Sequence, residues 1–291
     1  MFRCNLVEYI DLEQNIIPMR HIQIFEYFQK TRRKKDTTLH WSSGRLDATE
    51  TGIWKGKGID VNVKAYKKGE KNGIPYSSRT LFTFPNDKTI LKSIKYMDGS
   101  PIGKAAAADL IDYGVAIGLP DKAGISKYDV VLLPESRSLL LNEFLDAVLD
   151  IDPLQGRSWN PLVIRDAFHK MNCNEVIWDT EKIDKVQSES TKNQVLRIIQ
   201  RMAGNTEKFR ISDHLQFPPL RKFIKTFMTI SPEAQEAVRG KKVLIIDDFV
   251  TDGTTKRQMR DLVLPFGPSE VMNLALFSIR GLAGDNDKKE D

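Results

Sequence analysis

One segment of this chain carries the strongest structural signal: Lys242-Val243-Leu244-Ile245-Ile246-Asp247-Asp248-Phe249-Val250-Thr251-Asp252-Gly253-Thr254-Thr255. Its run of four apolar residues, 243–246, predicts a strand that is buried on both faces in the middle of a parallel sheet. Two adjacent carboxylates follow, then a polar loop with one glycine, then a helix from about Thr254 to Val263. A buried strand, a polar loop and a helix in this order are typical of an α/β fold.

Each part of this segment suits the binding of a phosphorylated ribose. Ligands of open α/β sheets bind outside the carboxyl ends of the strands. Backbone N–H groups at the start of a helix bind phosphate, helped by the helix dipole. Gly253 allows the loop a positive φ, and the threonine hydroxyls add hydrogen-bond donors. Asp247 and Asp248 accept hydrogen bonds, which suits the vicinal hydroxyls of a ribose, either directly or through a bound cation.

A simpler interpretation of the same segment is a structural strand, turn and helix. Asp and Thr are ordinary residues of turns and helix caps. Two aspartates, a glycine and two threonines in this order after four apolar residues are a much rarer combination. The sequence therefore favours the functional interpretation.

The segment resembles the phosphoribosyl diphosphate motif of the type I phosphoribosyltransferases. That motif has four apolar residues, two acidic residues, two apolar residues and a Thr/Ser-Gly-Thr phosphate loop. The resemblance implies that Asp247 and Asp248 hold the ribose hydroxyls and take part in catalysis. It also implies that the 5′-phosphate is wrapped by Thr251, Asp252, Gly253, Thr254 and Thr255.

The match departs from the family pattern in the loop. Asp252 stands where the family usually has a small residue. Because a carboxylate repels phosphate, we expect Asp252 to turn away or to contact the leaving base. Thr251 stands where the 6-oxopurine enzymes carry an acidic residue, which counts against a hypoxanthine-guanine type of enzyme.

A second loop is expected at the same edge of the sheet. Residues 128–133 form an apolar run that predicts a buried strand, and apolar residues at helical spacing follow from Leu140 to Leu149. The resemblance implies that the intervening loop binds diphosphate, with Arg137 as a further catalytic residue that pairs with its oxygens. The simpler alternative is a plain loop with a surface arginine. The expected diphosphate-binding residues are Glu135, Ser136, Arg137 and Ser138.

The family also uses a mobile basic loop and a hood over the base. Candidates for the basic loop are Arg165, Lys170 and Lys182. Trp159 or Trp178 is a candidate to stack on a base. The simpler interpretation of these residues is surface charge and core aromatic packing.

The rest of the chain gives a coarser organisation. Residues 1–120 form a β-rich α+β region of unknown role, a possible hood or dimer surface, with a helix over 105–118 that ends at Gly118 and Pro120. Residues 121–283 form the type I phosphoribosyltransferase-like parallel sheet core. Short strands are predicted at 162–164, 176–178 and 271–277, and an amphipathic helix at 191–202. An Asp- and Lys-rich tail, 284–291, is predicted to be disordered.

Composition excludes several classes of protein. Hydrophobic residues make up 41% and charged residues 29%, as in soluble globular proteins. No apolar run is long enough to span a bilayer, and the start lacks a signal peptide, so we expect a cytoplasmic protein without membrane partners. The two cysteines and four histidines are scattered, so we expect reduced thiols and no protein-built metal site. The basic run 30–35 is most simply a solvated helix end, although it leaves nucleic-acid binding open.

The expected function is transfer of a 5-phosphoribosyl group from phosphoribosyl diphosphate to a nitrogenous base, with Mg²⁺ as cofactor and release of diphosphate. The resemblance also implies a homodimer. Two alternatives remain open. One is a regulator that senses phosphoribosyl diphosphate or a nucleotide and binds nucleic acid or protein. The other is an enzyme that cleaves a phosphoribosyl bond with water or an unusual acceptor. The sequence names neither the acceptor base nor a cellular or phage origin.

Overall fold

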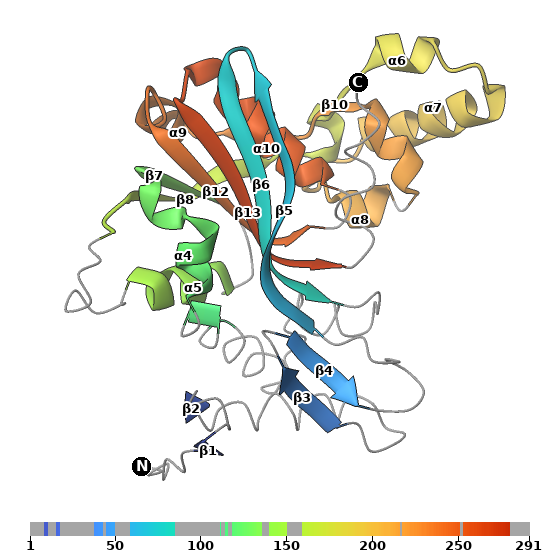
Figure 1. Ribbon diagram of the computed structural model, residues 1–291. Helices are drawn as coiled ribbons and strands as arrows, with labels where there is room; N and C mark the ends of the chain where they lie inside the picture. The colour runs from blue at the N-terminus through green and yellow to red at the C-terminus, as the bar shows by residue number, and fades with distance from the viewer. Residues whose placement is uncertain are drawn as a thin grey trace, which may run out of the picture.

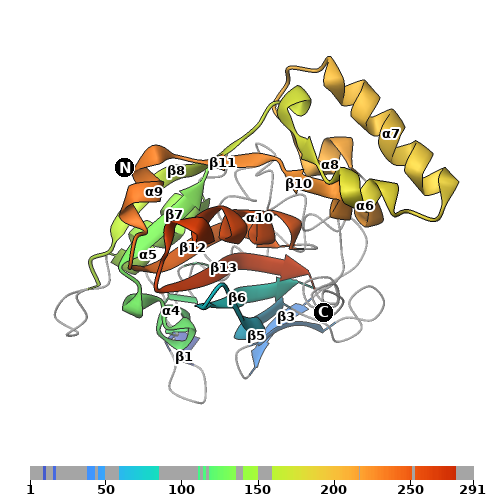
Figure 2. The same ribbon diagram turned by 90° about the horizontal axis from the view of Figure 1, so that it is seen from above.

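The computed structural model describes a large part of the chain (Figures 1 and 2). The described residues are 9–10, 16–17, 38–42, 45–49, 59–84, 111, 114–115, 118–135, 140–149, 159–215, 217–250 and 253–279. The basic run 30–35 and the tail 284–291 lie outside these residues. So do loop residues Ser136, Arg137, Ser138, Thr251 and Asp252.

A nine-stranded mixed sheet organises the described residues, in the order β11-β8-β7-β12-β13-β6-β5-β4-β3. Its five central strands, from β8 to β6, are parallel, and the flanking strands pair antiparallel. Their bounds are β3 Thr38–Ser42, β4 Arg45–Thr49, β5 Ile59–Lys71, β6 Ile74–Phe84, β7 Val130–Pro134, β8 Leu162–Lys170, β11 Met228–Ile230, β12 Lys242–Val250 and β13 Glu270–Ile279. This is the α/β parallel core that the sequence predicted.

Strand β12 is buried on both faces, as predicted. Val243 and Ile245 pack into a core that includes residues of α9 (Pro232–Ala237) and α10 (Thr254–Val263). Leu244 and Ile246 pack into the other core, with α4 (Leu119–Ala123) and α5 (Leu140–Leu149). Figure 2 shows α10 lying along β12 and β13. Helices therefore cover both faces of the parallel strands, and this explains why residues 243–246 of β12 are all apolar.

A hairpin connects the amino-terminal region to this sheet. Asn72 (φ 56°) and Gly73 (φ 76°) form the turn between β5 and β6, with Lys71 opposite Ile74. Positive φ at both positions is the geometry that two-residue hairpins require. Strand β6 then pairs in parallel with β13.

A helical excursion leaves the carboxyl end of β8 and returns at β11. It spans residues 171–227 and is drawn in yellow and orange on the right of Figure 1. Strand β9 confirms the predicted short strand near 176–178, and α7 confirms the predicted amphipathic helix. Its elements are η3 Cys173–Glu175, β9 Ile177–Trp178, α6 Thr180–Asp184, α7 Glu189–Ala203, α8 Ile211–His214, η4 Pro218–Phe223 and β10 Ile224–Thr226. Two-residue strands β1 (Tyr9–Ile10) and β2 (Ile16–Ile17) and the short turns η1 (Ile125–Lys127) and η5 (Leu264–Phe266) complete the described elements.

Two local boundaries add to the sequence prediction. The helix predicted over 105–118 is helical at residues 111, 114 and 115, and the Gly118 N–H donates to Val115 O at 3.0 Å. Gly118 also caps the start of a second helix, α4, and Pro120 lies in its first turn. A proline lacks only an N–H that is unbonded in the first turn anyway, so it begins a helix as readily as it ends one. Strand β12 also continues beyond Ile246 to Val250, because Phe249 and Val250 pair with Phe277 and Ser278 of β13.

Among the helices that the structure describes, none combines the length and the apolar character that a membrane span requires.

Candidate active site

The two predicted ribose-binding carboxylates lie on β12, at the carboxyl edge of the parallel strands. Asp247 Oδ1 accepts the N–H of Asp248 at 2.9 Å, and Asp248 Oδ1 accepts the N–H of Phe249 at 2.7 Å. Both side chains are half-buried. Both residues lie at the edge of the sheet where α/β proteins bind ligands.

Gly253 connects this loop to α10. Its φ of 76° and ψ of 5° place it in the left-handed region, as the sequence predicted, and it caps α10 without any side-chain hydrogen bond. The helices α6, α7 and α9 are capped by the side chains of Asp179, Ser188 and Ser231. Glycine thus occupies the cap position of α10 that a side-chain acceptor occupies in those three helices, and backbone N–H groups at a helix start can bind an anion.

Two cations that the sequence analysis missed lie at the same turn. A Cβ placed on Gly253 would lie 3.6 Å from Lys256 Nζ and 3.8 Å from Arg257 Nη1. Arg257 Nη2 also donates to Thr254 Oγ1 at 3.3 Å. The adjacent Lys256 and Arg257 could have been noticed in the sequence as cations close to the predicted loop. The helical spacing alone did not show that their side chains lie beside Gly253.

The predicted diphosphate loop leaves the same edge. Glu135, its first residue, follows β7, and its N–H donates to Phe168 O of β8 at 2.9 Å. The Glu135 carboxylate lies 3.7 Å from His169 Nδ1, and both side chains are largely exposed. Strand β8 bulges beside this loop, where Asp166 has a φ of 53°. The structure thus brings Glu135 and the β12 carboxylates to one edge, while residues 136–138 lie outside its description.

The three basic candidates for the mobile loop lie in different places. Arg165 is on β8 and contacts Asn142 and Asp146 of α5. Lys170 ends β8, at the start of the helical excursion. Lys182 is in α6 and pairs with Asp179 at 3.2 Å.

Of the two tryptophan candidates, Trp159 lies at the wrong edge. Its indole N–H donates to Tyr128 O at 2.9 Å, just before β7 begins. This is the amino edge, opposite the phosphate loop, so stacking of Trp159 on a base is contradicted and its role is structural. Trp178 packs against the core on the side of the helical excursion.

The described residues hold no cluster of three or more His, Cys, Asp or Glu side chains that would by itself hold a metal. Cys173 is a free, buried thiol 3.4 Å from His214 Nε2, and burial raises its pKa, with a further contribution from Glu207. A buried, protonated thiol is a poor nucleophile. The described groups at this edge are carboxylate oxygens, which accept hydrogen bonds, and N–H and cationic groups, which can donate hydrogen bonds to a phosphate.

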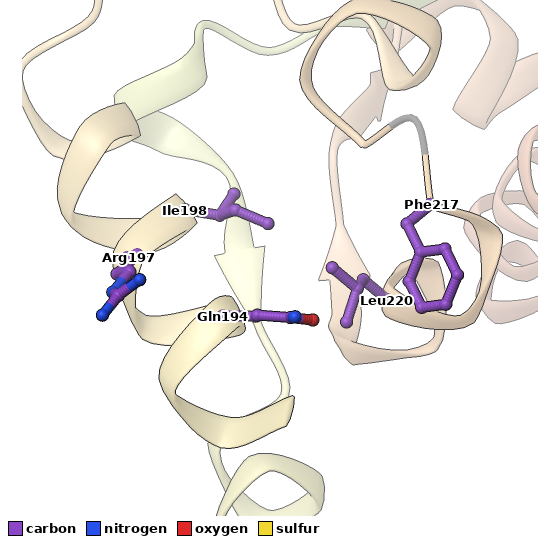
Figure 3. Close-up of a pocket in the computed structure, with 5 residues that line it drawn as sticks. All are labelled: Gln194, Arg197, Ile198, Phe217 and Leu220. Atoms are coloured by element: carbon purple, nitrogen blue, oxygen red, sulfur yellow. The ribbon is translucent and has the colours of Figure 1, made fainter. Parts of the chain in front are cut away.

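A groove of about 410 Å³ lies apart from these loops, between α7 and η4 (Figure 3). Figure 3 shows Gln194 of α7 pointing toward Leu220 of η4. The groove is lined by Gln194, Arg197, Ile198, Phe217 and Leu220. It is mainly apolar, and a phosphoribosyl group needs a dense set of donors and acceptors, so this groove is not its site.

The fold defines an α/β protein in which a central parallel strand is followed by a polar loop and a helix. Residues 126–290 match the family described as phosphoribosyl transferase domain. This match covers more than half of the chain, and the chain belongs to the type I phosphoribosyltransferase family. A comparison with curated proteins found no matching relative.

Proposed function

We propose that this protein transfers a 5-phosphoribosyl group from phosphoribosyl diphosphate to a nitrogenous base and releases diphosphate. The observation that carries the proposal is the β12–α10 unit, in which two carboxylates precede a left-handed glycine and a helix start without a side-chain cap. Membership of the family supports phosphoribosyl transfer in general. The choice of a nitrogen base as acceptor is our proposal.

In the proposed reaction, the bond from the anomeric carbon to the diphosphate oxygen breaks and a bond to a base nitrogen forms. The base gives up one proton, and the diphosphate carries away the bonding electron pair. Asp247 and Asp248 would accept hydrogen bonds from the ribose hydroxyls, and their charge would favour the positive charge that develops on the ring. The N–H groups at the start of α10 would anchor the 5′-phosphate.

The diphosphate end of the substrate would lie at the loop that follows Glu135. We propose that Arg137 pairs with the leaving oxygens there, since a guanidinium forms bidentate contacts with such groups. Mg²⁺ fits this donor set, because that ion is usually bound by one or two carboxylates together with substrate phosphates. Asp247 and Asp248 are the residues that would hold it, and it would neutralise the charge of the diphosphate.

Calorimetric titration of phosphoribosyl diphosphate with Mg²⁺ tests the site. We expect binding by the wild type and its loss in the Asp247→Asn, Asp248→Asn double variant. Diphosphate release is then measured with a panel of purines, pyrimidines and nicotinamide. Turnover with any base supports a transferase, and release without a base supports a hydrolase. Binding without turnover favours a sensor, and a folded wild type that binds neither phosphoribosyl diphosphate nor a nucleoside 5′-monophosphate overturns the proposal.

A further inference from the structure

We propose that the groove between α7 and η4 binds an acidic, amphipathic segment of a partner protein. The groove lies apart from the loops of the candidate active site, so the inference goes beyond the proposed function and does not depend on it. Its volume of about 410 Å³ falls within the range of about 300–1,000 Å³ that is usual for pockets that bind ligands. The partner is inferred from the apolar surface, the rigidity and the charge of the groove.

The apolar surface of the groove is the first observation. Phe217, which precedes η4, is 57% exposed, the largest fraction among the exposed large apolar side chains that the structure describes. Figure 3 shows Ile198 on the α7 side of the groove and Leu220 and Phe217 on the opposite side. Apolar groups of a bound segment would therefore contact apolar side chains from both walls. Burial of such surface favours binding by about 25 cal/mol per Å².

The walls of the groove are held by buried side chains beneath them. Val195 and Met202 of α7 and Phe223 of η4 are buried in one hydrophobic core. In the same core, the Phe209 ring meets the Phe227 ring edge-on, with 5.6 Å between the ring centroids. The groove is therefore formed before a partner binds. A preformed site lowers the entropic cost of ordering side chains on binding.

The charge of the walls indicates the kind of partner. Together α7 and η4 carry five lysine and arginine side chains against one carboxylate, that of Glu189 in the first turn of α7. Arg197 lines the groove and is exposed, and it forms no hydrogen bond or ion pair with any residue that the structure describes. A carboxylate on the bound segment would pair with Arg197, since a guanidinium forms bidentate contacts with carboxylates. Charge complementarity thus favours an acidic partner.

A nucleic acid is also acidic, but the groove suits it less well. Nucleic-acid binding gains most of its affinity from many phosphate contacts along a track of cations. Four of the five cations already contact groups of the protein itself, namely Lys192, Arg201, Arg221 and Lys222. Only Arg197 remains, beside a mainly apolar surface. One apolar anchor and one charged pair are the contacts that a bound peptide segment provides.

Selection from a library of random peptides displayed on phage, with the full chain as the target, tests the inference. We expect the wild type to enrich peptides that combine apolar residues at helical spacing with Asp and Glu. A synthetic, labelled copy of the most enriched peptide is then titrated by fluorescence anisotropy. Phe217→Ala should weaken its binding by about tenfold or more, because buried aromatic anchors dominate interface energies. Arg197→Glu should weaken it by about fivefold and reduce its dependence on salt.

Matched controls remove the same kinds of group elsewhere on the surface. Leu162→Ala truncates an apolar side chain that is 52% exposed at the start of β8, and Lys241→Glu reverses the charge of an exposed lysine just before β12. Both controls should bind the peptide as the wild type does. Thermal unfolding checks that each variant is folded. Should Phe217→Ala not fold, Arg197→Glu and Arg197→Gln decide, because Arg197 is exposed.

Weaker peptide binding in both groove variants, with wild-type affinity in both controls, supports the inference. It is overturned if no peptide is enriched, if the enriched peptides are basic or uncharged, or if the groove variants bind as tightly as the wild type. Two further measurements identify a different occupant and also overturn it. Sedimentation that shows a dimer, lost in Phe217→Ala, would assign the groove to a second copy of this chain. Binding of oligouridine, lost in Arg197→Glu, would assign it to nucleic acid.

Discussion

At the amino edge of the parallel sheet, Asp129 forms hydrogen bonds that join β7 to β12 and β8. At the carboxyl edge, two aspartates lie near the end of β12. The Asp129 N–H donates to Lys242 O, and Asp129 O accepts the Leu162 N–H, both at 2.9 Å. The Asp129 carboxylate accepts the Lys242 N–H at 2.9 Å. Beside it, Glu270 accepts from Lys127 Nζ at 2.7 Å and from Tyr128 OH at 2.8 Å. The carboxylates of Asp129 and Glu270 thus bond to groups of the protein that hold neighbouring segments together.

The polar groups of the carboxyl edge follow a different principle. Asp247 and Asp248 each accept the next N–H along the chain, and Gly253 starts a helix without a side-chain cap. Lys256 and Arg257 lie together in the first turn of α10. Departures from the usual residue choice at a helix start are expected at functional sites. The comparison teaches that the charged residues of the amino edge join segments that are distant in the sequence, whereas the backbone hydrogen bonds that Asp247 and Asp248 accept are local.

The largest expected effect comes from the carboxyl edge. The Asp247→Asn, Asp248→Asn double variant should lower kcat/KM by about a hundredfold or more, because two charged acceptors for the ribose are lost. Chemical denaturation should show a free energy of unfolding within about 1 kcal/mol of the wild type. The matched variant at the other edge is Asp129→Ala, which should lower stability and leave KM unchanged. The comparison breaks if Asp129→Ala lowers kcat/KM as much as the double variant.

Two left-handed glycines give the next test. Gly253→Ala and Gly240→Ala impose similar backbone strain, since their φ values are 76° and 66°, and each should cost about 1–2 kcal/mol of unfolding free energy. Only the Cβ at Gly253 meets side-chain atoms within 4 Å. We therefore expect an affinity loss of about tenfold for ribose 5-phosphate in Gly253→Ala and none in Gly240→Ala. Equal affinities measured by calorimetry would show that nothing binds beside Gly253.

Tyr128→Phe should affect stability alone. The phenol donates to the Glu270 carboxylate, so its removal should lower the unfolding free energy by about 1–2 kcal/mol in urea denaturation. Burial raises the pKa of Tyr128 well above its ordinary value, helped by Glu270. The neutral phenol thus stabilises the fold below pH 10, and this contribution is lost at higher pH. A changed KM for phosphoribosyl diphosphate would argue against separate roles for the two edges.

The smallest expected effect is the pH dependence that Glu270 contributes. Burial alone would raise the pKa of Glu270, but hydrogen bonds from Lys127 and Tyr128 outweigh it and lower the pKa below the ordinary 4.5. A carboxylate with a lowered pKa stabilises the fold above its unfolded value, and this contribution is lost as the pH falls through the folded value. Urea denaturation between pH 3 and 6 should therefore show a shallower acid loss in Glu270→Gln. An identical slope in both proteins would mean that the Glu270 contacts are not maintained in solution.

Much of the fold follows from local patterns in the sequence. The four apolar residues before Asp247 predicted a central strand, and the apolar spacing from Leu140 predicted α5. Patterns failed where one residue type serves two purposes. Pro120 stops a helix interior and starts a helix equally well, and Phe249 and Val250 looked like loop residues until β13 paired with them. Trp159 was a candidate for base stacking as well as for core packing, because the sequence does not show at which edge of the sheet an aromatic ring lies.

By itself the sequence determined the order of strand, acidic pair, glycine and helix, because residue chemistry and backbone preference act over a few neighbours. It also indicated the family, because this order of residues is a rare combination. Only the tertiary structure decided which groups from distant segments meet. It paired β6 with β13, put Glu135 and the β12 carboxylates at one edge, and folded the Lys256 side chain back over Gly253. These contacts depend on packing between elements far apart in the chain and on side-chain direction, and neither is encoded in local periodicity.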